Sequence, residues 1–198
     1  MLKKILYVLV AIILVFVIVV ALQPSDYRIE NSTTIAASPA KVFAQVNDFH
    51  KFEAWSPWAE LDPDVKMTYS GPDVGKGAAA AWAGDDKVGS GSMTIVESRP
   101  DEAVNIEVKF TEPVEGGTNS DFTFEPEGDK TKVTWAIHGQ HGFVEKAFCL
   151  VMGGLDMMSA DQKKGLANLK RVSELNKQWH LVGFPSPLRV GQPDFGQL

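Results

Sequence analysis

The sequence predicts an α+β domain, in which an antiparallel sheet packs against one long late helix, preceded by one membrane-spanning helix. Three observations predict this class. Residues 5–22 form an uncharged apolar run. Between residues 65 and 138, apolar and polar residues alternate in short segments that turn residues separate, which is typical of an antiparallel meander. Residues 143–175 return to helical spacing. A sheet with one apolar face and a helix with one apolar stripe are expected to cover each other.

The first segment predicts an uncleaved membrane anchor. Residues 5–22 contain no charge, glycine or proline. At about 1.5 Å per residue the run is about 27 Å long, close to the roughly 30 Å of a bilayer core. A buried core helix would normally carry a polar stripe, which this run lacks. A cleaved secretory signal is the main alternative, because Lys3 and Lys4 form a basic start and residues 19–21 loosely fit a cleavage site. Signal cores are usually shorter than this run.

The flanks of the anchor predict its direction. Lys3 and Lys4 precede the span, whereas Asp26, Arg28 and Glu30 mix signs after it. The positive-inside rule therefore predicts a single-pass protein with a cytoplasmic N-terminus and a periplasmic or extracytoplasmic domain.

Composition excludes some partners of the soluble part. Without Lys3 and Lys4, 17 basic residues remain against 25 acidic ones, a formal balance of −8. Such a domain repels phosphate backbones and anionic headgroups, so we expect no nucleic acid partner and no electrostatic docking to membranes. The single cysteine, Cys149, cannot form an internal disulfide, which fits a bacterial domain stabilised by its core.

The chain after the anchor divides into a connector at 23–26, a domain at 27–176 and a tail at 177–198 that contains proline and glycine. The domain begins with a strand at 27–35. Ser38 and Pro39 then start a helix, since serine caps free N–H groups and proline suits the first helical position. A short helical turn is expected at 49–55.

Six further strands are expected, and their alternation predicts one buried and one wet face. Their ranges are 65–69, 78–83, 91–98, 103–110, 120–125 and 132–138. The apolar face comprises Met93, Ile95, Val104, Ile106, Val108, Phe110, Phe122, Phe124, Val133, Trp135 and Ile137. In the late helix at 143–175, Gly153 and Gly154 should bend or loosen the backbone.

The order of these elements resembles the helix-grip fold of the SRPBCC or START-like superfamily, and within it the polyketide cyclase/dehydrase-like proteins of bacteria. The likeness is carried by residues 35–43 (IAASPAKVF), 55–58 (WSPW), 75–82 (GKGAAAAW) and 164–170 (KGLANLK). It covers about residues 27–175. The resemblance implies a cavity between a curved sheet and the long helix that suits an apolar small molecule. It does not fix a function, because the superfamily mixes carriers, receptors, cyclases and chaperone activators.

Large aromatic and methionine side chains are the candidate ligand-binding residues, because such side chains line adaptable apolar pockets. They are Trp55, Trp58, Trp82, Phe122, Trp135, Phe148, Met152 and Met158. Each of them can equally be a simple core residue. Trp55 and Trp58 flank Pro57 in a loop, which favours a place at the pocket rim or at the membrane interface.

Polar chemistry is sparse. His138 and His141, with Glu145 just beyond, are weak candidates for acid/base catalysis or for zinc. However, His138 falls on the polar side of the alternation and so is expected to face solvent. The glycine-rich residues 71–76 are one residue too short for a phosphate loop, and Gly77 follows instead of Ser or Thr. We therefore assign no metal and no cofactor.

Three functions remain open from the sequence. The first is a membrane-tethered binding domain for a hydrophobic or lipid-like small molecule, which contacts the bilayer through residues 5–22. The second is a cyclase or hydrolase that uses one of the two histidines. The third is a membrane-associated module that binds a protein partner, whose identity the sequence leaves unknown.

Overall fold

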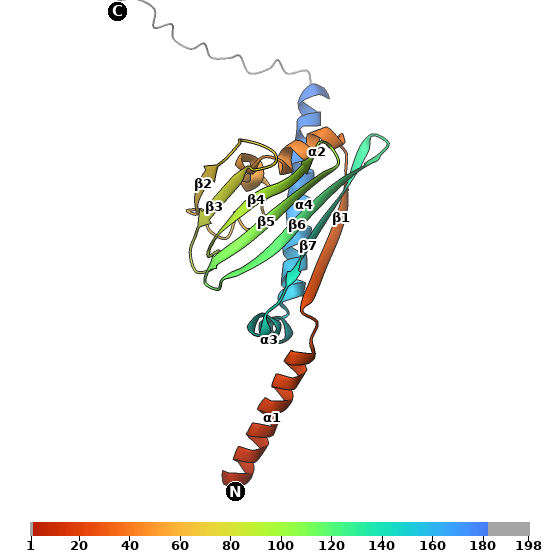
Figure 1. The fold of residues 1–198 in the computed structure, drawn as a ribbon. Helices are drawn as coiled ribbons and strands as arrows, with labels where there is room; N and C mark the ends of the chain where they lie inside the picture. The colour runs from red at the N-terminus through yellow and green to blue at the C-terminus, as the bar shows by residue number, and fades with distance from the viewer. Residues whose placement is uncertain (1, 182–198) are drawn as a thin grey trace, which may run out of the picture.

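The computed structural model describes residues 2–181, and Figure 1 shows a curved sheet in front of one long helix, with a separate N-terminal helix projecting from the domain. The helices and strands follow in this order: α1 (Leu2–Leu22), β1 (Asp26–Ile35), α2 (Pro39–Val46), η1 (Phe49–Ala54), β2 (Lys66–Ser70), β3 (Ala79–Ala83), β4 (Ser90–Arg99), β5 (Ala103–Glu112), β6 (Gly116–Glu127), β7 (Lys130–Gln140), α3 (Phe143–Met152) and α4 (Gly154–Leu181).

The seven strands form one antiparallel sheet in the order β1-β7-β6-β5-β4-β3-β2. Strands β2 to β7 make a meander, and β1 joins its far edge by pairing with β7 over the full length from Asp26 to Ile35. The expected class and all seven strands are therefore confirmed. The alternation is confirmed as well, because Ile95, Val104 and Val133 are fully buried on the inner face.

Helix α2 and the 3₁₀-helix η1 cross the end of the sheet. Pro39 occupies the start of α2, as the sequence predicts, and Ser38 precedes it in extended backbone without a side-chain capping bond. Val42 and Val46 point into the core. Together these helices close the end of the sheet that is farther from α1 (Figure 1).

Helix α4 covers the inner face of the sheet and packs chiefly against β1. Its residues Leu166 and Leu169 are buried in the core. Gln162 is fully buried as well. Its carboxamide oxygen accepts a hydrogen bond from Asn31 Nδ2 at 2.7 Å, and its Nε2 donates to the Trp135 carbonyl at 3.2 Å. The amide thus joins the helix to both β1 and β7.

The late helix differs from the expected continuous element. Gly153 ends α3 because its backbone takes a left-handed conformation with φ of 66°, while its N–H still donates to the Cys149 carbonyl. Gly154 begins α4 as a new helix. The glycine pair therefore breaks the helix rather than bending it. Helix α4 continues to Leu181, so the first residues of the expected tail are helical, and residues 182–198 lie outside the described part of the chain.

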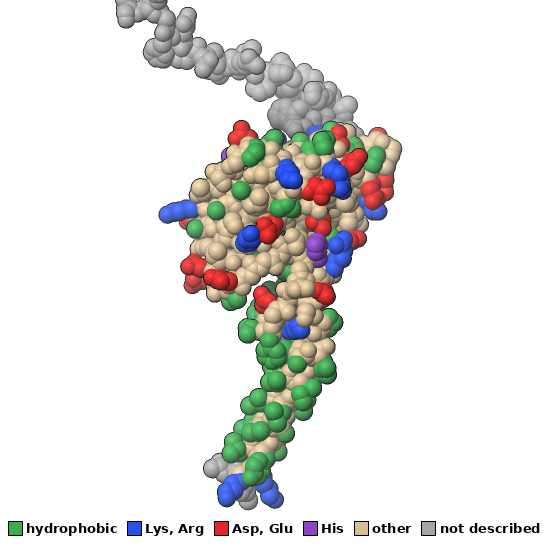
Figure 2. All heavy atoms as spheres, in the orientation of Figure 1, with side chains coloured by type: hydrophobic (Ala, Val, Ile, Leu, Met, Phe, Trp, Pro, Cys, Tyr) green, Lys and Arg blue, Asp and Glu red, His purple; other side chains and the backbone are tan. Residues whose placement is uncertain are grey.

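Helix α1 is long and apolar enough to cross a membrane, with a mean hydropathy of 3.5 within Lys3–Leu22. A signal sequence at the N-terminus would pass the same test. Figure 2 shows apolar side chains on all visible sides of α1, with basic side chains at its free end. Among residues 3–22, Val20 alone is buried.

Candidate functional site

A cavity of about 600 Å³ lies between the inner face of the sheet, the segment after η1 and the start of α4. Its wall is mostly aromatic and aliphatic. The lining residues are Phe49, Phe52, Glu53, Ser56, Trp58, Ala59, Asp62, Pro63, Val65, Met67, Tyr69, Trp82, Lys87, Val88, Met93, Ile106, Val108, Phe110, Thr118, Ser120, Phe122, Trp135, Ile137, Phe148, Gly154, Met157, Met158 and Asp161. The volume lies within the range of small-molecule sites.

Trp135 and Phe122 form the floor of this cavity. Their rings stack with centroids 4.9 Å apart and planes 24° apart. The indole Nε1 of Trp135 donates a hydrogen bond to Ser120 Oγ at 2.6 Å. Trp58 meets the Trp135 ring edge-on at 6.0 Å. These contacts hold two large rings in fixed orientations, as a pre-formed pocket requires.

Glycines let these rings lie close to the backbone. A Cβ at Gly91 would lie 2.5 Å from Trp82 Cζ2, so only glycine leaves room for the Trp82 ring against β4. A Cβ at Gly165 would lie 2.7 Å from Trp135 Cζ3. Gly165 therefore permits α4 to approach the floor.

The polar groups deep in the cavity are already paired with the protein. Thr118 Oγ1 accepts a hydrogen bond from the Tyr27 hydroxyl at 2.9 Å and donates to the His138 carbonyl at 3.0 Å. Burial raises the pKa of Tyr27, and the nearby Glu145 and Cys149 raise that pKa further, while the bond to Thr118 opposes the shift. The phenol is therefore a neutral donor near pH 7, and the deep lining offers mainly apolar surface.

Charged side chains lie toward the rim. Glu53 and Lys87 are exposed lining residues. Asp62 is engaged, since its carboxylate accepts the backbone N–H groups of Asp64 and Asp85. The cavity thus combines an apolar interior with a polar edge, which suits an amphipathic molecule.

The structure brings six of the eight candidate ligand-binding residues together. Trp58, Trp82, Phe122, Trp135, Phe148 and Met158 line the cavity. Trp55 does not, because it is only 1% exposed and its Nε1 donates to the Gln45 carbonyl in the core. Its ring meets the rings of Phe122 and Trp135 edge-on inside the core, so it does not lie at a pocket rim. Met152 is 58% exposed at the end of α3 and is not a lining residue.

Sequence reasoning missed some lining residues. Phe52 comes from η1, Met67 from β2 and Met157 from α4. The alternation of Val65 and Met67 was a usable signal for β2. Met157 is adjacent to Met158, which the sequence predicts as a ligand-binding residue. No local pattern distinguishes which of two adjacent methionines faces a cavity.

The two histidines lie outside the lining. His138 Nε2 is 2.7 Å from Asp121 Oδ2 on the outer face of the sheet, as the alternation predicts. The His141 ring stacks on Tyr27 at 4.0 Å and its Nε2 is 3.9 Å from Cys149 Sγ. Neither imidazole reaches the cavity wall, so catalysis in the cavity by these residues has no geometric basis. Within residues 2–181, no group of three His, Cys, Asp or Glu side chains is placed to hold a metal ion.

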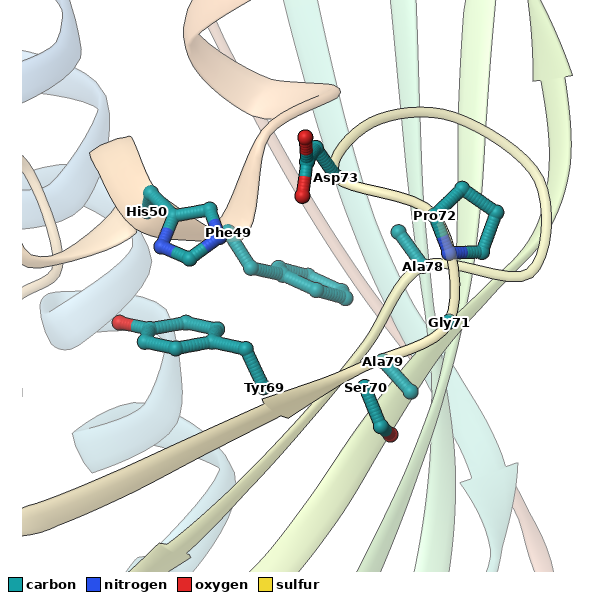
Figure 3. A pocket seen from close by; sticks show the side chains of 9 residues that line it. All are labelled: Phe49, His50, Tyr69, Ser70, Gly71, Pro72, Asp73, Ala78 and Ala79. Carbon is teal, nitrogen blue, oxygen red and sulfur yellow. The ribbon is translucent and has the colours of Figure 1, made fainter.

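A second, smaller pocket of about 150 Å³ lies between η1 and the β2–β3 connection. Figure 3 shows the His50 and Tyr69 rings facing each other at its edge, with centroids 4.0 Å apart. Burial, followed by the charges of Glu53 and Asp48, raises the pKa of Tyr69. With only a quarter of the main cavity's volume, this pocket is a weaker candidate site.

A curved antiparallel sheet around a long C-terminal helix, with a cavity between them, defines a helix-grip domain. The chain belongs to the polyketide cyclase/dehydrase and lipid transport family, whose model matches residues 26–174. No curated protein matches the chain by sequence.

Solved structures share the fold at low sequence identity. The KanY protein is 19% identical with a TM-score of 0.56, and the match covers 75% of this chain and 98% of that one. An Aha1 dimer from Colwellia psychrerythraea is 17% identical with a TM-score of 0.54, covering 76% and 98%. Protein CV1439 from Chromobacterium violaceum is 14% identical with a TM-score of 0.53, covering 74% and 96%. At these identities the likeness shows the fold alone.

Proposed function

We propose that this protein is a membrane-tethered binding domain for a hydrophobic or lipid-like small molecule, held in the cavity between the sheet and α4. The observation that carries the proposal is the cavity itself, with about 600 Å³ enclosed by mainly apolar side chains. Burying apolar ligand surface in such a space is favourable by about 25 cal/mol per Å². The family description, which includes lipid transport, supports the same class of ligand.

The tether is part of the proposal. Residues 1–22 serve as an uncleaved anchor, residues 23–26 as a connector and residues 27–176 as the binding domain. Lys3 and Lys4 keep the N-terminus cytoplasmic, so the cavity lies on the outer side of the membrane. An anchored carrier works where apolar ligands are concentrated, without releasing them into water.

A binding function fits the side chains better than catalysis does. The floor presents the rings of Trp135 and Phe122, and the hydroxyls of Thr118 and Ser120 are held by Tyr27 and Trp135. Neither candidate histidine contacts the cavity. The polar edge near Glu53 and Lys87 orients the polar end of an amphipathic ligand.

Native mass spectrometry of the detergent-solubilised full chain, followed by organic extraction, tests the proposal. The wild-type protein should carry a co-purifying apolar molecule. Val108→Trp places an indole in the cavity and should abolish retention, whereas Val96→Trp, at an exposed valine outside the lining, should retain the ligand. Equal retention by the two variants, both folded by circular dichroism, would place the ligand elsewhere and refute the proposal.

A further inference from the structure

Helix α3 exposes an apolar surface. Val144 is 73% exposed, Val151 65% and Met152 58%. Outside α1, six of the fourteen large apolar side chains that are exposed in the described residues belong to this ten-residue helix. The apolar patch comprises Phe143, Val144, Phe148, Leu150, Val151 and Met152. A contiguous exposed patch of this kind marks an interaction surface.

The opposite side of α3 holds the helix in place. The Glu145 carboxylate accepts the Gly142 N–H at the start of the helix and also lies beside Gly116 in the neighbouring hairpin. Cys149 Sγ is near His141 Nε2. None of residues 143–152 is buried. The more polar side of the helix therefore faces the domain, and of the apolar patch Phe148 alone lines the cavity.

The patch lies next to the end of the apolar helix α1. Helices α1 and α3 contact each other, and Val20 near the end of α1 is completely buried. The connector is tied down as well, because the His141 N–H donates to the Ser25 carbonyl at 2.8 Å. Figure 1 shows α3 at the base of the domain beside the upper end of α1. The three residues 23–25 between α1 and β1 span at most about 10 Å, so α3 cannot lie far from the surface that α1 enters.

We propose that α3 is an interfacial helix, whose apolar patch lies in the outer surface of the bilayer that α1 spans. Amphipathic helices bind in this way with their apolar side about 5–10 Å into the boundary between headgroups and acyl chains. Because the domain carries a net negative charge, it is not attracted to anionic headgroups. Apolar contact is therefore the remaining way for the domain to dock on the bilayer. This inference rests on the membrane anchor of the proposed function and adds a second contact with the lipid.

The placement brings part of the cavity wall close to the membrane surface. Phe148 of α3 and Met157 of α4 are 56% and 58% exposed, yet both line the cavity. This part of the wall therefore lies at the same surface as the patch. An apolar ligand would pass from the lipid into the cavity beside Phe148 without crossing bulk water.

Depth-dependent fluorescence quenching in the full chain tests the inference. In a Cys149→Ser background, Val151→Cys is labelled with an environment-sensitive nitrobenzoxadiazole dye and the protein is reconstituted in phosphatidylcholine vesicles. Val15→Cys in α1 is the membrane reference. Val74→Cys is the aqueous reference, because Val74 is an exposed valine in the β2–β3 connection at the opposite end of the domain.

The expected result is blue-shifted emission at position 151, quenched most strongly by lipids that carry the spin label near the headgroup. Position 15 should be quenched by deeper labels and position 74 by none. If position 151 emits as position 74 does while position 15 is quenched, the interfacial helix is refuted and the anchor stands. Blue-shifted emission at position 151 without quenching by spin-labelled lipid would show that protein, and not lipid, covers the apolar patch. That result would also refute the interfacial helix. Failure to quench position 15 would refute the anchor and the inference together.

Discussion

The indole N–H of Trp135 donates to the hydroxyl of Ser120 at 2.6 Å, between neighbouring strands β7 and β6 at the cavity floor. Both residues are buried. The bond satisfies a donor that would otherwise be desolvated without a partner, and it fixes the plane of the ring that stacks on Phe122.

Removal of this acceptor should destabilise the domain. Ser120→Ala leaves the indole N–H unpaired in an apolar site, so the free energy of unfolding should fall by about 1–3 kcal/mol. Chemical denaturation of the full chain in detergent measures the loss. Ser32→Ala, at an exposed serine on β1, is the matched control and should change little. In a Trp135→Phe background the Ser120→Ala cost should disappear, and an undiminished cost there would contradict the assigned bond.

Loss of the buried Gln162 amide should destabilise the domain by an amount similar to that of Ser120→Ala. Gln162→Leu preserves the bulk of the side chain but leaves the Trp135 carbonyl without this donor and removes the nearer of the two acceptors of Asn31 Nδ2. The expected cost is about 1–3 kcal/mol in the free energy of unfolding. Lys163→Leu makes the same apolar replacement at the exposed neighbouring position and should be close to neutral. Similar effects of the two variants would show that the amide does not hold α4 to the sheet.

The thiol of Cys149 should react slowly. Burial, and then the negative charge of Glu145, raise its pKa above the ordinary value. Because the thiolate is the reactive form, a raised pKa means a smaller reactive fraction at a given pH than in a free cysteine. Alkylation of the full chain across a series of pH values, followed by mass spectrometry, should therefore give a midpoint above that of free cysteine measured alongside. A midpoint below that value would show that His141 at 3.9 Å activates the thiol instead.

Loss of both candidate histidines should spare ligand binding. The double variant His138→Ala with His141→Ala removes a hydrogen bond to Asp121 on the outer face and a ring that stacks on Tyr27, and neither contact borders the cavity. Ligand retention in native mass spectrometry should equal that of the wild type, with Val108→Trp as the control that loses it. A folded double variant without ligand would restore a role for these residues.

Much of the site follows from periodicity. Alternation in β5, β6 and β7 correctly assigns Val108, Phe122 and Trp135 to the inner face, because successive side chains of a strand point to opposite sides. The same alternation correctly predicts that His138 lies on the outer face of the sheet. No such rule applies to a loop. Trp55 and Trp58 stand on either side of Ser56 and Pro57, yet one lies in the core and the other on the cavity wall.

The amino-acid sequence by itself determined the apolar N-terminal helix, the seven strands with their buried face, and a late helical element weakened at Gly153 and Gly154, because each depends on local periodicity, charge and backbone preference. Tertiary structure alone decided that the late element divides into two helices with different surroundings, that Trp55 is core, and that the apolar patch of α3 lies beside α1. These outcomes depend on which segments distant in sequence meet in space. An apolar helix looks the same in sequence whether its neighbour is a sheet or another helix, and only the contact of α3 with α1 in the folded chain distinguishes the two cases.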